Sequence, residues 1–273
     1  VFGRMIHLLK RVLVGGARAI AIAVITPTGF QLARYARIFD RALRELDPAV
    51  VHAHELVTLA GGWRHRRRGR VALVYDSHEL ELGRNARFSA WEKRLRAHAE
   101  RFLIRRTDAV VTVCDSIADY LANHYRIPRP TVVLNSPEDA PAASGQRTIR
   151  EYLGLTSHTP LAIYVGKVTT NRGIEISLEA LRAYPEAHLA LIGPREPVVA
   201  ARIKAMADDM GLSARLHFVD PVPHAEVVGF IGSADVSLVL IQPVCLSYEF
   251  CFPNKLLESI LAGVPVLASR LVE

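Results

Sequence analysis

The chain has 273 residues, of which 50% are hydrophobic and 22% charged, and a formal net charge of +7. This length and apolar content predict two domains, each with a core of its own. Its three cysteines are scattered, which excludes a disulfide framework and suits a reducing cytoplasm.

The first 30 residues are apolar with interspersed cations, above all Met5 to Val14. Arg18 interrupts the apolar run, so we do not expect a membrane-spanning helix. No clear Ala-x-Ala site supports a secretory signal. An interfacial amphipathic segment and a core helix both remain open.

Four apolar segments in the N-terminal half end in polar residues and are predicted to be strands: 48–55, 71–79, 109–114 and 131–137. Asp115 and Ser116 are expected to cap a helix over 117–124. His52 and His54 form a His-x-His pair at the first strand end, and His78 follows the second strand. Sequence spacing places no third ligand beside the pair, so no metal site is expected.

A segment rich in Pro, Ala, Ser and Gly between Asn135 and Gln146 predicts a linker. We therefore divide the chain into an N-terminal domain over 1–138, a linker over 139–150 and a C-terminal domain over 151–273.

The C-terminal domain alternates apolar strands with helices. Strands are predicted over 161–167, 187–194, 216–219 and 234–240, with helices over 198–210 and 224–231. Because these strands are apolar throughout, they predict a parallel sheet covered on both faces. Ligands of such sheets bind at the carboxyl ends of the strands, where Lys167, Pro194 and Val222 lie.

Cations and glycines bracket the loop after the first of these strands, as Gly166-Lys167 and Arg172-Gly173. Backbone N–H groups, the dipole of the following helix and the two cations together suit a diphosphate. The loop does not match the P-loop pattern, because no Ser or Thr follows Lys167 at the required spacing.

The segment from Cys251 to Ser269 predicts a loop, a short helix that begins at Pro253, a turn at Gly263 and a buried strand. Lys255 and Glu258 are three residues apart and share one helix face, where they can hold an anion and a pair of sugar hydroxyls. A surface helix with one exposed ion pair explains the same residues equally well.

Five motifs in this order resemble the donor-binding domain of family 4 glycosyltransferases. They are Tyr-Val-Gly-Lys with Asn-Arg-Gly, Leu-Ile-Gly-Pro, Phe-Val-Asp-Pro-Val-Pro, Ala-Asp-Val, and Pro-Asn-Lys-Leu-Leu-Glu-Ser with Ala-Gly-Val-Pro-Val. The resemblance covers 160–269 well and 48–138 moderately. It implies the GT-B fold, in which two Rossmann-like α/β domains face a cleft. The chain begins without Met and stops before the closing helices of that fold, so we expect it to be incomplete at both ends.

The resemblance also implies a retaining, metal-independent transfer from a nucleoside diphosphate sugar, with no cofactor. Lys167 and Arg172 would stabilise the donor diphosphate, Glu258 would hold the ribose hydroxyls, and His78 would lie beside the reacting carbon. The implied donor-binding residues are Gly166, Lys167, Arg172, Val222, Glu249, Asn254, Lys255 and Glu258. Many members carry an acid eight residues before the last Glu. Phe250 stands there in this chain, so Glu249 is out of register by one residue. A nucleotide-sugar epimerase of the same architecture and a non-catalytic nucleotide-sugar-binding protein are the alternatives.

The positive charge belongs to the N-terminal half. Residues 1–150 hold 25 Lys and Arg against 14 Asp and Glu, a net charge of +11, with the densest run at 64–70. We expect a cytoplasmic protein that attaches peripherally to an anionic membrane surface, with a membrane-associated glycan or lipid as acceptor. A solvated basic face is the simpler reading. Nucleic acid is not expected as a partner, because no aromatic residues interleave with the arginines.

Overall fold

A computed structural model describes residues 27–86, 88–137 and 147–273. These divide into two compact units. Unit 1 holds the described residues up to Leu134, together with Cys245–Phe250 and Glu273; unit 2 holds Asn135–Val244 and Cys251–Val272. The apolar segment Met5 to Val14 and most of the predicted linker over 139–150 lie outside the described residues.

Unit 1 is built on a parallel sheet in the order β1-β2-β3-β4. Its strands are β1 (Val50–His54), β2 (Ala72–Ser77), β3 (Ala109–Thr112) and β4 (Thr131–Val132). Its helices are α3 (Pro27–Leu46), α4 (Glu55–Arg66), α5 (Ala90–Ile104), α6 (Asp115–Tyr125) and α11 (Leu246–Glu249). The last strand is shorter than the predicted 131–137. The predicted cap was wrong: α6 begins at Asp115 with Cys114 at the N-cap position, which makes no side-chain capping bond.

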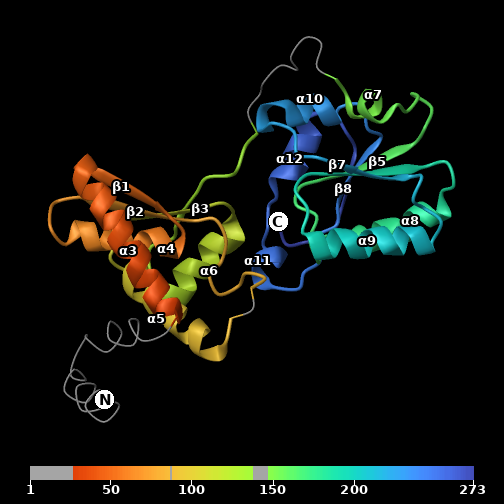
Figure 1. Cartoon of the computed structure of the whole chain (residues 1–273). Helices are drawn as coiled ribbons and strands as arrows, with labels where there is room; N and C mark the ends of the chain where they lie inside the picture. Colours follow the sequence, from red (N-terminus) through yellow and green to blue (C-terminus); the bar gives the residue numbers. More distant parts are fainter. Residues whose placement is uncertain (1–26, 87, 138–146) are drawn as a thin grey trace. The chain divides into compact units, whose positions relative to one another are not determined.

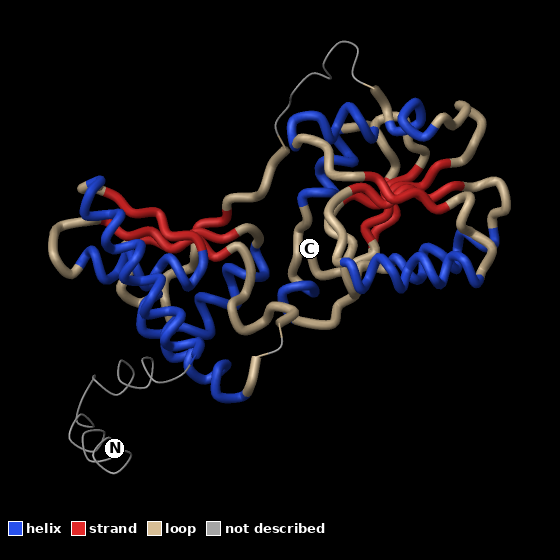
Figure 2. Tube along the Cα trace, in the orientation of Figure 1, coloured by secondary structure: helices blue, strands red, loops and turns tan. Residues whose placement is uncertain are grey.

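The sheet of unit 1 has one buried face. In β1 the side chains alternate, so that Val51 and Ala53 are buried while His52 and His54 are exposed. Figure 2 shows the described helices of unit 1 on one side of the sheet. The face that carries the histidines is therefore open to solvent in the described part of the chain.

The short helix α11 packs within unit 1 although its sequence neighbours belong to unit 2. Ser247 anchors it: its backbone N–H donates to Gly83 O over 3.0 Å, and its hydroxyl lies 3.1 Å from both Leu80 N and Leu80 O. Cys114 Sγ donates to Phe250 O over 3.1 Å. The segment Cys245–Phe250 is thus fixed at both ends of the helix.

Unit 2 is a five-stranded parallel sheet in the order β7-β6-β5-β8-β9. Its strands are β5 (Leu161–Val165), β6 (His188–Ile192), β7 (Leu216–Val219), β8 (Val236–Val239) and β9 (Val266–Ala268). Its helices are α7 (Ile149–Leu153), α8 (Ile174–Ala183), α9 (Pro197–Asp209), the 3₁₀ helix η1 (His224–Glu226), α10 (Val227–Ile231) and α12 (Asn254–Leu261).

Helices cover both faces of this sheet, as its apolar strands predict. Leu178 of α8 and Ile203 of α9 belong to one core cluster, and Ile149 of α7 and Phe230 of α10 belong to another. Figure 1 shows α8 and α9 on one side of the strands and α7, α10 and α12 on the other. The strand order reverses at β5, which pairs with β6 on one side and β8 on the other. A crevice at such a switch point is the usual ligand site of an open α/β sheet.

Candidate functional site: a cationic loop at the switch point of unit 2

The loop after β5 lies at this switch point and begins in a left-handed backbone conformation. Gly166 has φ +125°, and its N–H donates to Ile192 O over 2.8 Å. Gly193, at the end of β6, has φ +134°, and a Cβ placed on it would lie 2.5 Å from Gly166 O. The two strand ends therefore approach as closely as they do because neither residue has a side chain.

Lys167 forms an exposed ion pair with an acid that the sequence did not single out. Its Nζ lies 2.6 Å from Glu196 Oε1, and the two side chains are 56% and 41% exposed. Hydrogen bonding to Lys167 and Thr169 lowers the pKa of Glu196. Such an exposed pair is weak in water, so a diphosphate can displace the carboxylate at small cost.

The far end of the loop is fixed by Gly173, the N-cap residue of α8 with φ +73°. A Cβ placed on it would lie 2.4 Å from Leu240 Cβ, so the loop packs against the segment after β8. Gln242 N donates to Asn171 O over 3.1 Å in the same region. Arg172 is thereby held beside the N-terminus of α8, where the helix dipole favours an anion.

Lys255 of α12 joins this loop from the other side of the switch point. Its Nζ lies 4.0 Å from the centroid of the Tyr164 ring and 3.0 Å from where a Cβ on Gly166 would be. Burial, followed by the positive charge of Arg172, lowers the pKa of Lys255 to about 7. Lys255 therefore lies over an aromatic ring within the electrostatic reach of a second cation.

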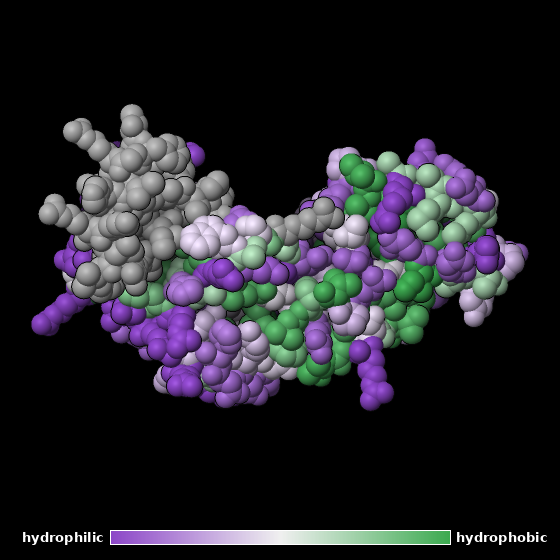
Figure 3. All heavy atoms as spheres, turned by 90° about the horizontal axis from the view of Figure 1, so that it is seen from below, coloured by the Kyte–Doolittle hydropathy of each residue, from purple (hydrophilic) through white to green (hydrophobic). Residues whose placement is uncertain are grey.

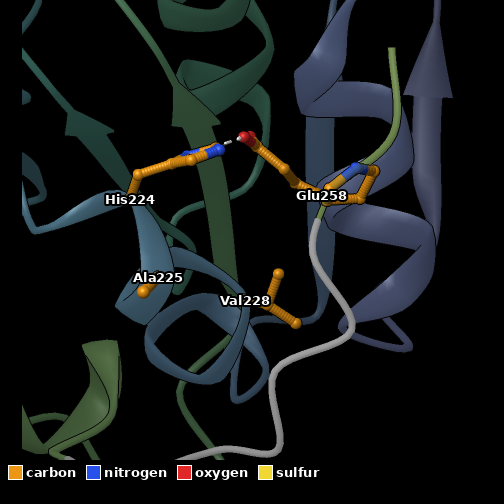
Figure 4. Close-up of a pocket in the computed structure, with 5 residues that line it drawn as sticks. His224, Ala225, Val228 and Glu258 are labelled. Atoms are coloured by element: carbon orange, nitrogen blue, oxygen red, sulfur yellow. Dashed lines mark ion pairs between the residues drawn. The ribbon is translucent and has the colours of Figure 1, made fainter. Parts of the chain in front are cut away.

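Glu258 is buried on α12 and lines a small pocket with Pro137, Ala225 and Val228. Figure 4 shows its carboxylate directed toward His224, whose Nδ1 lies 3.6 Å from Glu258 Oε1. Burial raises the pKa of Glu258, while His224 and Lys255 oppose that shift. Within the described residues, the ion-pair partner of Glu258 is thus His224 and not Lys255 of the same helix.

The other predicted donor residues differ in what they offer. Asn254 is the exposed first residue of α12, one residue after the predicted helix start. The side chain of Val222 packs against the core, which leaves its backbone for a ligand. Glu249 ends α11 and belongs to unit 1. Its contact with a sugar stays a prediction.

His78 lies in unit 1, in the loop after β2. Its Nε2 is 2.9 Å from His54 Nδ1 and 3.5 Å from Asp76 Oδ1. Its place beside a reacting carbon also stays a prediction. The sequence does not show that His54 lies beside His78, because the two residues are brought together by the register of β1 and β2.

Two family models together match nearly the whole chain. One, described as "Glycosyl transferase 4-like domain", matches residues 9–137, and one described as "Glycosyl transferases group 1" matches residues 145–273. The chain belongs to the family 4 glycosyltransferases.

Relatives within this family include the D-inositol 3-phosphate glycosyltransferase of Corynebacterium glutamicum. It is 27% identical over 241 residues, which cover 81% of this chain and 56% of the relative. The chain spans about half the length of the curated relatives it matches.

Solved structures of the same fold include sucrose-phosphate synthase of Thermosynechococcus elongatus, with a TM-score of 0.67 at 20% identity over 88% of this chain and 60% of that chain. Another is Anabaena HepE in complex with UDP and glucose, with a TM-score of 0.68 at 16% identity over 88% of this chain and 64% of that chain. These similarities confirm the predicted GT-B fold. None of the helices in the described ranges is long and apolar enough to cross a bilayer.

Proposed function

We propose that this family 4 glycosyltransferase transfers a sugar from a nucleoside diphosphate sugar to an acceptor, with retention of configuration. The observation that carries the proposal is the gathering of Lys167, Arg172 and Lys255 around the Gly166–Gly173 loop and the N-terminus of α8. Cations held close together repel one another, and a bound anion offsets that repulsion. A diphosphate supplies two anionic groups for this purpose.

The same cluster gives a mechanism for leaving-group departure. Negative charge grows on the diphosphate as the glycosidic bond breaks, and fixed cations in a partly desolvated site stabilise that charge. In this proposal the side chains, rather than a metal, hold the diphosphate. Sequence spacing places no carboxylate as a nucleophile, so a front-face displacement accounts for retention.

Glu258 is the proposed acceptor for the ribose hydroxyls. Its carboxylate is buried, and its partner His224 comes from a different element. Hydroxyl groups that replace His224 would keep the buried carboxylate hydrogen-bonded. The complexes of Anabaena HepE with UDP and UDP-glucose support a nucleotide sugar as the donor class.

Product analysis tests the proposal against its alternatives. The chain is incubated with radiolabelled nucleotide sugars, with and without a membrane-lipid or glycan extract, in the presence of EDTA. Transfer that survives EDTA and retains the anomeric configuration by NMR supports it. Isomerised nucleotide sugar without an acceptor would indicate the epimerase, and binding without turnover would indicate a non-catalytic protein.

The acceptor class is proposed from charge. The basic N-terminal half suits an acceptor at an anionic membrane surface, and peripheral attachment at the cytoplasmic face agrees with that acceptor.

A further inference from the structure

We propose that unit 1 binds one divalent first-row transition metal ion, such as Zn²⁺, through His52, His54 and Asp76, with His78 as a fourth ligand. This inference does not depend on the proposed function. It also departs from the expectation of no metal site. Sequence spacing placed no third ligand beside the His-x-His pair, but the register of β1 and β2 places Asp76 there.

Two short motifs on neighbouring strands make up the cluster. His52 and His54 alternate on β1, and Asp76 lies near the end of β2. The register pairs His54 with Asp76, so these three residues point to the same face of the sheet. His78 follows β2 by one residue, and its ring contacts His54 and Asp76. Imidazole and carboxylate together suit Zn²⁺, Ni²⁺ or Cu²⁺.

The spacings of the ligand atoms fit a common centre. Asp76 Oδ2 lies 3.0 Å from His52 Nε2 and 3.4 Å from His54 Nδ1. The ligand atoms of these three residues lie within 4.8 Å of one another. Bonds of 2.0–2.1 Å in tetrahedral geometry separate neighbouring ligand atoms by about 3.3 Å. The rings of His52 and His54 stack nearly parallel, with their centroids 4.7 Å apart. At least one of the two rings must therefore rotate before both nitrogens can point at a common ion.

The ligands lie on the open face of the sheet, with His52 and His54 side chains 48% and 56% exposed, so an ion can enter from solvent.

The backbone that carries these ligands is held in place by contacts within the protein. Glu55 follows His54 with φ +66°, a strained conformation for a residue other than glycine. Its carboxylate accepts from His78 N over 3.2 Å and from Arg84 over 2.6 Å, which ties the two ligand segments together.

Metal binding would compete with the hydrogen bond between His54 and His78. That contact uses His54 Nδ1 and His78 Nε2, the same atoms that would coordinate an ion. A bound ion would thus remove the contact and hold both rings in one orientation.

The test measures Zn²⁺ binding to the full chain, purified without a histidine tag, by calorimetry in a chelator-free buffer. The absorption spectrum with Co²⁺ is a second readout, because tetrahedral coordination gives strong visible bands. The variants are His52→Ala and Asp76→Asn. The matched control is the double variant His188→Ala/His217→Ala in unit 2. It removes two stacked histidines whose Nδ1 (His188) and Nε2 (His217) atoms lie 2.7 Å apart.

We expect the wild type and the control to bind one Zn²⁺ per chain. In both test variants the affinity for Zn²⁺ should fall at least about tenfold. Circular dichroism shows whether each variant is folded. His52 is exposed, so His52→Ala keeps the test decisive even if Asp76→Asn fails to fold. Absence of stoichiometric binding in the wild type, or unchanged affinity in His52→Ala, would overturn the proposal.

Discussion

Lys255 and Arg172 present the sharpest electrostatic feature at the scale of single residues. Lys255 is held near Arg172 in a partly desolvated position, and the cost is visible in its lowered pKa. Electrostatic interactions with Glu258 and Cys251 oppose that shift. If a diphosphate binds at this site, as proposed, its affinity should depend on the protonation of Lys255, because a charged Lys255 is unfavourable in the free protein and favourable beside an anion.

Affinity for UDP should therefore fall as pH rises above about 7. Lys255 in the free protein has a pKa of about 7, so it is charged below that pH and neutral above it. A bound diphosphate favours the ammonium, which raises this pKa in the complex. Binding then takes up a proton, and affinity falls by at most about tenfold per pH unit. Calorimetry from pH 7 to 9 checks this, and Lys255→Arg should give a flat profile. A flat profile for the wild type contradicts the assignment.

Lys167→Ala should weaken the binding of UDP by about 1.5–3 kcal/mol, the usual worth of a charge-assisted hydrogen bond. The loss should lie near the lower end of this range. In the wild type, Lys167 must give up its ion pair with Glu196 to contact the diphosphate, which offsets part of the binding free energy. Lys204→Ala, at an exposed position on α9, is the control. Unchanged affinity in both Lys167→Ala and Arg172→Ala would remove the diphosphate from this loop.

Glu258→Gln should lose affinity for UDP far more than for 2′-deoxy-UDP. A buried carboxylate that accepts two hydroxyls discriminates strongly against a ligand that lacks one of them. Competition binding with the two nucleotides measures the ratio in the wild type and the variant. Equal losses for both ligands would assign Glu258 a structural role in its contact with His224.

At the scale of elements, one buried carboxyl joins three elements of unit 1. Glu100 of α5 accepts from Tyr75 of β2 over 2.9 Å and from Tyr125 of α6 over 2.5 Å. Burial raises its pKa to about 7, although both tyrosine hydrogen bonds oppose the shift. The packing of two helices on the sheet therefore depends on a group that titrates near neutral pH.

Glu100 should make unit 1 less stable as pH rises from about 4.5 to 7. The folded state keeps the proton up to about pH 7, while the unfolded chain releases it near 4.5, so folding is favoured at the acid end of this range. Thermal unfolding from pH 5 to 8 measures the difference between the wild type and Glu100→Gln. The melting temperature of Glu100→Gln should rise relative to that of the wild type as pH increases to about 7, and the difference between them should then stay constant. A constant difference would show that Glu100 is charged throughout.

The elements also show how far sequence reasoning extends. Apolar runs located the strands of unit 2, and the Gly-Lys and Arg-Gly pairs located its cationic loop, because both signals are local. Glu196 and His224 were missed as partners of Lys167 and Glu258, since each comes from a distant element. Asp76 was missed beside His52 and His54 for the same reason: only strand register brings them together.

At the scale of the whole molecule, the positive charge of the N-terminal half is less free than its composition suggests. Figure 3 shows many hydrophilic residues on the part of unit 1 that this view exposes. Within the dense run at 64–70, however, Arg64 and Arg68 pair with the buried Asp40, and Arg66 pairs with Asp108. Arg67 packs over the Trp63 ring, and Arg70 is exposed. Part of the run therefore stabilises the unit rather than serving a partner.

Binding to anionic vesicles should weaken steeply with salt if unit 1 attaches to a membrane surface. Each Lys or Arg near such a surface contributes about 1 kcal/mol, within a Debye length. Arg67→Gln/Arg70→Gln should reduce binding without breaking an ion pair of the described residues, and Lys204→Gln in unit 2 should not. Flotation assays measure this. Protein that stays at the bottom of the gradient with anionic and neutral lipids alike would reduce the run to a solvated face.

The position of α11 has a consequence for dividing this molecule into pieces. The chain leaves unit 2 after Val244, supplies Cys245–Phe250 to unit 1 and returns at Cys251. A cut near the predicted linker would separate Leu80, Gly83 and Cys114 from the partners that Ser247 and Phe250 provide. An N-terminal fragment would therefore lack a segment of unit 1 that only the C-terminal part of the chain supplies. Helix α12, which carries Lys255 and Glu258, begins four residues after Phe250, so only a short stretch of chain joins it to that segment of unit 1.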